Sequence, residues 1–468
     1  MSPSRAAPHR PGAGGTRTTD DGRQAQVDQV AQVDRAGTRR LPWILLASWG
    51  ASRLVLLLYV FKVLVFPGPD VTGDVSFIYH GWYEVLRTGT YPQGDVTWQY
   101  PPAAALAILS PALLPFLDYA SAFFVLALLA DLAVLTLLLH AGSRPGRTRR
   151  GAWVWVVGLP LLGPTVYARY DVMVTAVAVA ALLAGSRHPR VMGALVAFGA
   201  LLKVWPVLLL LGARTRAAWA SAAVTAGSLA LLFALAMPGA FDFLSFQRDR
   251  GTEVESLGAL VFHVARQFGW NGQVLLNYGS VEFLGDYVDV VSNAALLLSA
   301  AAFAWLLLWR ARARRFAPHT LADAAFVAVL MFTTTSRVIS PQYMVWLVGL
   351  AAVCLCFRAS RMTTPAVVVL VASFVTVLEF PIWFGHVVMS DWLGVTLMFL
   401  RNGLLVLATL LAALELWQEH APRKGRGELR DQPHATRSQE PHPGVWERGP
   451  QRMGTGRGGG GETLDQPS

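Results

Sequence analysis

The sequence predicts an all-α protein that crosses a membrane many times. The chain has 468 residues, of which 54% are hydrophobic and only 15% are charged, and its mean hydropathy is +0.44. Apolar runs long enough to span a bilayer recur through most of its length. In a soluble protein the net charge of +10 would indicate nucleic acid, but basic residues on one side of a bilayer follow from membrane topology. We therefore expect a membrane lipid environment and no nucleic-acid partner.

The chain divides into a central membrane domain, residues 41–417, and two polar tails. Residues 1–40 and 418–468 are rich in Arg, Gly, Gln and Asp without periodicity, so both tails are predicted to be disordered. The first apolar run, Leu41–Phe61, is too extended for a cleaved signal peptide and predicts a spanning helix. Arg53 inside this run either snorkels, pairs with another helix or contacts a lipid phosphate.

Two of the following apolar segments are interrupted. Residues 103–116 contain Pro111 and Pro115, which predicts a short or re-entrant element. Residues 191–211 are broken by Lys203-Val204-Trp205-Pro206, which predicts two short helices meeting near the outer face. Full spans are expected at Tyr119–His140, Ala152–Ala168, Val172–Gly185, Ala217–Ala236, Val288–Trp309, Leu321–Ser336, Tyr343–Phe357, Ala366–Phe384 and Trp392–Trp417. The total is roughly 12 membrane segments.

The loop charges predict which side of the membrane each loop faces. Short loops with arginines and no acids belong in the cytoplasm, and the acid-bearing loops then face outward, with both tails inside. The arginine loops contain Arg144, Arg147, Arg149, Arg150, Arg187, Arg190, Arg214, Arg216, Arg310 to Arg315, Arg358 and Arg361. The outer loops contain Asp70, Asp74, Glu84, Asp95, Asp242, Asp249, Glu253, Glu255, Glu282, Asp286 and Asp391.

A long first outer loop, Gly73–Pro102, is polar, aromatic and rich in turns, although it lies between strongly apolar segments. A chain that keeps such a loop beside a membrane is expected to use it for chemistry. Its first carboxylate, Asp74, is the candidate catalytic base. The alternative is that Asp74 only caps a surface helix beginning at Val75, in which case Asp95 or Asp171 would replace it.

Other polar groups fall at the outer ends of apolar segments, on the same predicted side as Asp74. They include Arg169-Tyr170-Asp171, Lys203, Arg250, Glu255 and Arg337, the last of which precedes Ser340-Pro341-Gln342-Tyr343. Charges in or beside apolar segments are costly and usually pair with one another or with a ligand. Cations beside a carboxylate suit a reaction that releases a lipid phosphate, because the carboxylate accepts a hydroxyl proton while positive charge stabilises the leaving group.

These residues resemble the polyprenyl-phosphate-sugar-dependent transferases of the GT-C superfamily, most closely the family 87 actinobacterial mannosyltransferases. The resemblance covers about residues 41–417 and rests on several motifs in order: the Asp74 loop with Gly89 and Tyr91, Tyr100-Pro101-Pro102, the Lys203/Pro206 break and Ser340-Pro341-Gln342-Tyr343. It implies a GT-C-type fold and an inverting, metal-independent transfer without a cofactor. The region of Gln93-Gly94-Asp95 departs from the usual pattern, which affects the expected acceptor contacts.

The expected protein is a multi-pass glycosyltransferase of the cell membrane with an outward-facing site. It would move a sugar, expected to be mannose, from a polyprenyl phosphate donor to a lipid-linked or cell-envelope glycan acceptor. The alternatives are an arabinofuranosyltransferase using its own lipid phosphate, or a lipid-linked-sugar transporter or flippase. Expected roles are the general base for Asp74, donor-phosphate binding for Lys203, Arg337 and Arg250, and substrate binding for His80, Tyr100, Gln342, Tyr343 and Glu255.

Overall fold

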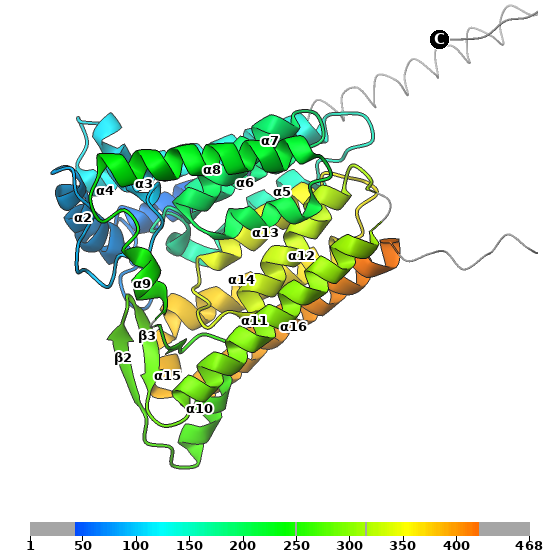
Figure 1. Cartoon of the computed structure of the whole chain (residues 1–468). Helices are drawn as coiled ribbons and strands as arrows, with labels where there is room; N and C mark the ends of the chain where they lie inside the picture. Colours follow the sequence, from blue (N-terminus) through cyan, green and yellow to red (C-terminus); the bar gives the residue numbers. More distant parts are fainter. Residues whose placement is uncertain (1–42, 249, 314–315, 421–468) are drawn as a thin grey trace, which may run out of the picture. The chain divides into compact units, whose positions relative to one another are not determined.

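The computed structural model describes residues 43–420, except residues 249, 314 and 315. The predicted tails therefore lie outside the described residues, apart from residues 418–420, which end helix α16. Within the described part the chain is a mostly helical bundle (Figure 1). The all-α membrane architecture expected from hydropathy is therefore found.

Six helices are long and apolar enough to cross a membrane, or seven if one bent pair counts as a single span. This count for residues 43–420 does not support roughly 12 full segments. The long helices are Trp43–Val60, α4 (Tyr119–Gly142), α8 (Arg216–Ala236), α11 (Val288–Arg312), α14 with η5 (Thr363–Ile382) and α16 (Trp392–His420). Shorter helices account for the other apolar runs: α3 with η2 (Ala104–Leu113), α5 (Arg150–Gly158), η3 (Pro160–Val166), α6 (Asp171–Ala184), α7 (Pro189–Leu202), η4 (Trp205–Gly212), α12 (Thr320–Thr335) and α13 (Tyr343–Cys354).

The count is lower because several apolar helices have fewer than 18 residues, and because prolines and glycines divide some of the other apolar runs. The pair η3 and α6 is bent by 119°, and Gly163 within η3 has a φ of +60° that favours glycine. The predicted break at Lys203 is found: α7 ends at Leu202, Lys203 is extended with φ −158° and ψ 132°, and η4 follows. Hydropathy registers the apolar residues but not these changes of direction.

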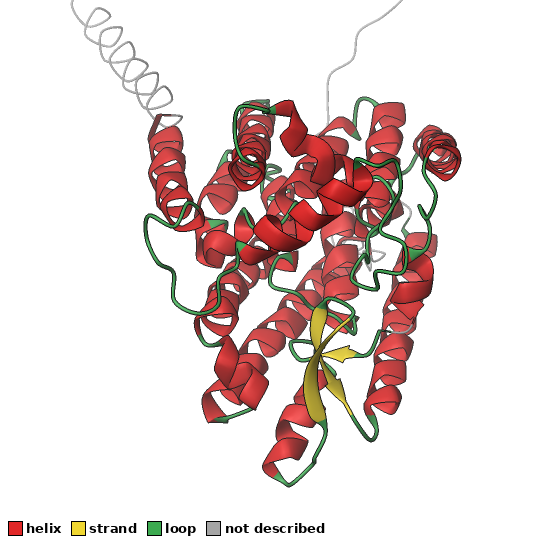
Figure 2. Cartoon of the chain, turned by 90° about the vertical axis from the view of Figure 1, so that its left-hand side faces the viewer, coloured by secondary structure: helices red, strands yellow, loops and turns green. Residues whose placement is uncertain are grey.

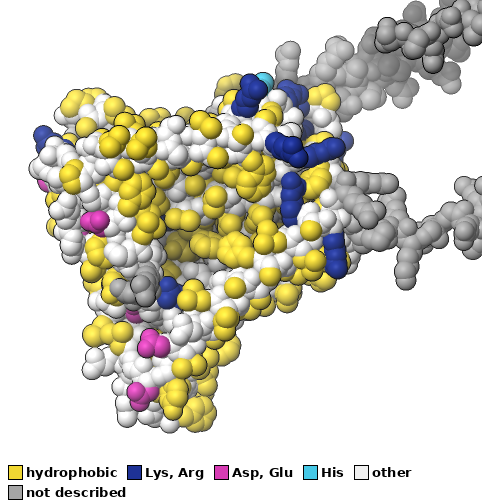
Figure 3. All heavy atoms as spheres, viewed as in Figure 1, with side chains coloured by type: hydrophobic (Ala, Val, Ile, Leu, Met, Phe, Trp, Pro, Cys, Tyr) yellow, Lys and Arg dark blue, Asp and Glu magenta, His cyan; other side chains and the backbone are white. Residues whose placement is uncertain are grey.

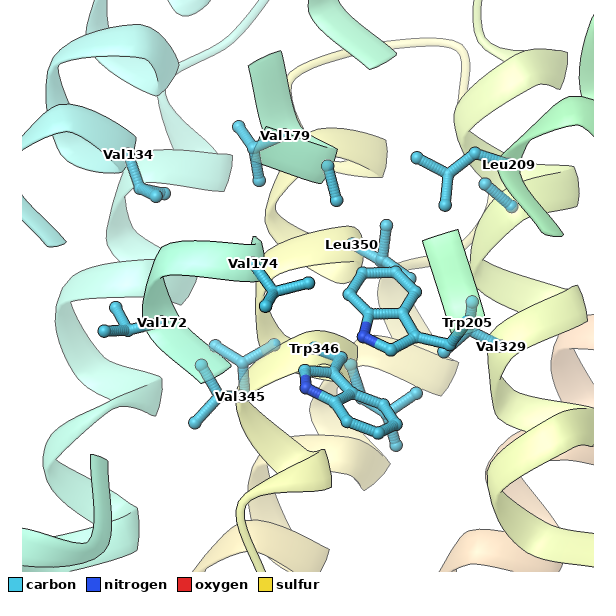
Figure 4. Close-up of a cluster of buried hydrophobic side chains, with 14 of the residues drawn as sticks. Val134, Val172, Val174, Val179, Trp205, Leu209, Val329, Val345, Trp346 and Leu350 are labelled. Carbon is cyan, nitrogen blue, oxygen red and sulfur yellow. The ribbon is translucent and has the colours of Figure 1, made fainter. Parts of the chain in front are cut away.

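The centre of the bundle is packed around two tryptophans from different elements. Trp205 of η4 and Trp346 of α13 are fully buried, and their rings stack with centroids 5.2 Å apart. Figure 4 shows them among buried aliphatic side chains such as Val174 and Leu350. Trp205 follows Lys203 and Val204 in the chain. Its stacking on Trp346 therefore places Lys203 beside the start of α13.

A buried ion pair joins the first helix to α4. The Nε of Arg53 donates to Oδ2 of Asp131 at 2.8 Å, and both side chains are almost inaccessible to solvent. The same carboxylate accepts from Trp155 Nε1 at 2.7 Å and Tyr167 Oη at 2.6 Å. Of the alternatives for Arg53, pairing with another helix is the one found. The ion pair offsets the free-energy cost of placing a charge in an apolar run.

Short elements gather at one end of the bundle. The first outer loop begins with a π-helical turn, η1 (Asp74–Tyr79), and α2 (His80–Leu86). A three-stranded antiparallel sheet of order β1-β3-β2 lies at the same end (Figures 1 and 2) and was not expected from the sequence. The elements there are α9 (Phe243–Arg248), β1 (Thr252–Glu253), α10 (Ala259–Gln267), β2 (Gln273–Asn277), β3 (Ser280–Leu284) and α15 (Phe384–Met389).

Charged side chains separate toward the two ends of the helices. In the face shown in Figure 3, most Lys and Arg side chains lie at one end, and Asp and Glu lie at the end that carries the sheet. Hydrophobic side chains cover the surface between them. This separation is the arrangement that the positive-inside rule describes for a membrane protein.

Candidate functional site

Asp74 forms an ion pair with Arg169 at the sheet-bearing end. Asp74 is itself the first residue of η1, and no side chain caps that helix, so the predicted capping role at Val75 is not found. The Asp74 carboxylate contacts the Arg169 guanidinium, and the two side chains are 38% and 14% exposed. Arg169 also donates to the carbonyl of Ala168 at 2.8 Å. The Asp74 carboxylate is therefore held against a cation and still partly accessible to solvent.

Lys203 forms the second ion pair. Its Nζ lies 2.7 Å from Oδ1 of Asp171, and the same oxygen accepts from Trp346 Nε1 at 2.6 Å. The other Asp171 oxygen, Oδ2, is buried and has no hydrogen-bond partner among the described residues. Four aromatic rings surround the ammonium at 5.1–5.6 Å from their centroids, namely Tyr100, Tyr170, Tyr343 and Trp346. A cation is favoured in such a cage by the ring quadrupoles.

The two ion pairs are linked through Tyr170. Arg169 and Asp171 flank this residue in the chain, so each pair has one member at the turn that opens α6. The Tyr170 ring packs against Tyr100 with centroids 5.3 Å apart and against Tyr79 of η1 at 6.1 Å. We call the group Asp74, Arg169, Asp171 and Lys203 the charged cluster. The structure thus brings Asp74, Lys203, Tyr100 and Tyr343 of the predicted site together.

The motif Ser340-Pro341-Gln342-Tyr343 is held in place by Glu253. One Glu253 oxygen accepts from the backbone N–H of Ile339 at 2.6 Å, and the other accepts from Ser340 Oγ at 3.2 Å. Gln342 is the N-cap residue of α13 and is partly exposed. Tyr343 stacks on Trp346 with centroids 4.0 Å apart. Glu253 thereby positions the segment that supplies one ring of the Lys203 cage, a role that sequence reasoning missed.

Arg250 and Arg337 differ in the groups that their guanidinium groups contact. Arg250 donates to Ser280 Oγ at 2.7 Å and lies 3.7 Å from Glu282, while its charge also acts on Lys203. Arg337 donates to the backbone carbonyls of Arg250 at 2.7 Å and Gln247 at 3.2 Å. The structure therefore brings Arg250 within electrostatic range of the charged cluster, whereas the Arg337 guanidinium holds the loop that carries Arg250.

Glu255 lies in a different, buried group. Arg401 binds Glu379 through two hydrogen bonds of 2.7 and 2.8 Å, and its Nη2 lies 3.9 Å from Glu255. Burial, and then the nearby charges of Glu379 and Glu253, raise the pKa of Glu255 well above its ordinary value. Burial also raises the pKa of Glu253 to about 7. Sequence reasoning missed Arg401 and Glu379, although Glu379 is the single charge in its apolar run and Arg401 lies in the middle of another.

Two further candidates, His80 and Asp95, contact residues that are not members of the charged cluster. His80 is half exposed, stacks on Tyr119 with centroids 4.9 Å apart and lies 3.7 Å from Glu84. Burial raises the pKa of Asp95, but hydrogen bonds from Thr97 and Trp82 outweigh this and leave it below its ordinary value. Asp95 thus closes the turn of the first outer loop, and of the two replacement bases only Asp171 belongs to the cluster.

Comparison with known proteins identifies one family. The model of glycosyltransferase family 87 matches residues 98–341. No curated protein and no solved structure matches the chain. The matched segment contains Tyr100, Arg169, Asp171, Lys203 and Arg250, while Asp74 precedes it.

Proposed function

Because the chain belongs to glycosyltransferase family 87, we propose that it transfers mannose from a polyprenyl phosphate to a lipid-linked or cell-envelope glycan at the outer face of the cell membrane. The observation that carries this proposal is the charged cluster. It pairs an accessible carboxylate, Asp74, with cations at the end of an apolar helical bundle. Such a site can take a proton from an acceptor hydroxyl and stabilise a departing phosphate.

The distribution of charge supports the outward orientation. The loops that contain Arg144, Arg187 and Arg358 join the helices at the end opposite the charged cluster, and short arginine loops are retained in the cytoplasm. The carboxylates of the first outer loop and the sheet then face the outer side. A site in this position would receive both a donor and an acceptor that are embedded in the outer leaflet.

Apolar surface beside Lys203 supports a donor with a long hydrocarbon chain. Val204 and Val207, which follow Lys203, are 52% and 44% exposed despite their apolar side chains. Among the six long helices, α8 and α11 have the smallest fraction of residues in their apolar stretch buried within the protein, 17% and 11%. Figure 3 shows a hollow lined by hydrophobic side chains on the face that these helices border. A polyprenyl chain lying in this hollow would bring its phosphate toward Lys203.

The proposed reaction is a single displacement with inversion. The acceptor oxygen attacks C1 of the sugar, the bond from C1 to the phosphate oxygen breaks, and the phosphate leaves with the bonding electrons. Asp74 accepts the acceptor proton as general base. Arg169 fixes the orientation of Asp74, while Lys203 and Arg250 stabilise the charge that grows on the leaving phosphate. Tyr100, Tyr343, Gln342 and His80 are the proposed contacts with sugar and acceptor.

An arabinofuranosyl donor would react by the same steps, so the transferred sugar must be determined by experiment. The purified protein is incubated in lipid vesicles with labelled polyprenyl phosphate mannose and, in parallel, with the arabinofuranose donor. We expect release of polyprenyl phosphate and label transfer from the mannose donor alone. Transfer from only the arabinose donor would refute the mannose assignment, and movement of intact donor across the vesicle without transfer would favour a flippase.

A further inference from the structure

Three ligand-type side chains meet at the opposite end of the bundle, far from the charged cluster. His319 precedes α12, Asp323 lies in its first turn, and Glu419 lies in the last turn of α16. Nε2 of His319 is 2.7 Å from Oε1 of Glu419. One ligand atom from each residue lies within 4.8 Å of the other two. An imidazole and two carboxylates form a donor set of one nitrogen and two oxygens.

The carboxylate of Asp323 has an unsatisfied atom in this group. Asp323 is fully buried, and Ser360 Oγ donates to its Oδ1 at 2.8 Å. Its Oδ2 is also buried, and no N–H or O–H group of the described residues donates to it. The Cys354 thiol lies within hydrogen-bonding range of this carboxylate, but a thiol is a weak donor. A buried carboxylate oxygen without a strong partner is costly, and a bound cation would remove that cost.

We propose that His319, Asp323 and Glu419 bind one divalent transition-metal ion, with Zn²⁺ as the best match. Imidazole nitrogen with carboxylate oxygen suits Zn²⁺ better than Mg²⁺ or Ca²⁺, which prefer oxygen-only ligand sets. Bonds of about 2.0–2.2 Å require ligand atoms closer together than the widest pair here, so binding draws the three side chains inward. Ser360 acts as the group that orients Asp323, as hydrogen-bonded outer partners commonly do.

The site would fasten the end of the last helix to the rest of the bundle. His319 and Asp323 begin α12, while Glu419 is the penultimate residue of α16. Cross-linking positions that are 100 residues apart in the chain restricts the unfolded state as well as fraying of the helix end. Arg147 is the neighbouring cation that acts on His319, and the two carboxylates offset its charge. The role is structural and separate from sugar transfer.

The test uses the full-length protein without a histidine tag, stripped with chelator and titrated with Zn²⁺, Mn²⁺ and Mg²⁺. We expect one tight Zn²⁺ equivalent, a higher unfolding temperature with Zn²⁺ and no response to Mg²⁺. Asp323→Asn and His319→Ala should each abolish that equivalent. Ser360→Ala should weaken Zn²⁺ binding by about 10- to 100-fold. Co²⁺ absorption in the visible range provides a direct readout of the ligands.

Histidines elsewhere in the chain require a matched control. His140 is exposed at the same end and lies 3.0 Å from Arg144 through Nε2, outside the proposed ligand set. His140→Ala should keep the tight equivalent. Equal Zn²⁺ binding by the wild type, His319→Ala and Asp323→Asn would overturn the proposal, as would no tight equivalent in the wild type. If His319→Ala does not fold, Ser360→Ala and Asp323→Asn, which nearly preserve shape, decide the question.

Discussion

Lys203 and Asp171 form an ion pair 2.7 Å long, with Trp346 donating to the same carboxylate oxygen. The lysine is therefore compensated before any donor arrives. An anionic phosphate would add to the pair rather than meet a bare ammonium. The second carboxylate oxygen of Asp171, Oδ2, is buried and has no hydrogen-bond partner in the described part of the chain.

Lys203→Met is expected to lower the rate of sugar transfer more than it weakens donor binding. The phosphate carries more charge after bond cleavage than before, so a fixed cation matters most in the transition state. Lys203→Arg should rescue the rate only in part because a planar fork replaces a point charge. Single-turnover kinetics at saturating donor measure both effects.

Removing the lysine alone also leaves Asp171 as a buried unpaired charge, which costs roughly 3–5 kcal/mol. The double variant Lys203→Met/Asp171→Asn should therefore recover stability while its transfer rate remains low. If the double variant recovers the rate as well, Lys203 has only a structural role.

Asp74→Asn is expected to abolish transfer while expression and donor binding stay close to wild type. The amide keeps the shape of the side chain but cannot accept the hydroxyl proton. Asp70→Asn is the matched control, because Asp70 is a nearby exposed carboxylate paired with Lys62 at 2.8 Å. Turnover assays on both variants test the assignment, and near-wild-type turnover by Asp74→Asn would refute it.

The proposed orientation predicts which positions a membrane-impermeant thiol reagent can reach in intact cells. In a variant lacking Cys354 and Cys356, cysteines replacing the exposed Gln93 and Asp286 should be labelled from outside. Cysteines replacing Ser143 and Arg312, which are exposed at the other end, should be labelled only after the cells are permeabilised. The reverse labelling pattern would place the charged cluster on the cytoplasmic side and refute the proposed mechanism.

The buried glutamates predict that stability falls as pH rises. The pKa of Glu253 is about 7 when folded, against 4.5 ordinarily. Between these values the folded protein holds a proton that the unfolded chain releases. Each such proton lowers the free energy of unfolding by about 1.4 kcal/mol per pH unit.

Thermal unfolding of detergent-solubilised protein from pH 4.5 to 7 measures this slope. Glu253→Gln should flatten it, and Glu84→Gln, an exposed control, should not. An unchanged dependence of stability on pH in Glu253→Gln would show that the Glu253 carboxyl does not cause it.

The sequence predicted the apolar helices and the break at Lys203 because each depends on local composition, whereas for Arg53 it left pairing open beside snorkelling and a lipid-phosphate contact. It did not predict which charges pair. Arg53 meets Asp131 across 78 residues and Lys203 meets Asp171 across 32, and such choices depend on how helices pack. The sheet was missed because β1 has two residues and no alternation long enough to recognise.

The candidate site was also predictable only in part. Asp74, Lys203, Tyr100 and Tyr343 were named because unusual residue types interrupt apolar sequence. Arg169 was noted only as part of a motif, since its carboxylate partner lies in another element. His80 lies on the first outer loop, but its ring stacks on Tyr119 and its Nε2 lies near Glu84, because the contacts of a side chain depend on the helical turn that carries it.

The Arg53–Asp131 pair has a consequence for how the chain is made. Ribosomes deliver the first helix 78 residues ahead of its carboxylate partner. During that interval the arginine enters the translocon unpaired, and a central arginine costs about 2.5–3.5 kcal/mol to insert. We therefore expect stable integration of the first helix to wait for α4. A nascent chain truncated before residue 131 should leave the first helix poorly integrated, and that result would show that insertion proceeds by pairs of helices rather than one at a time.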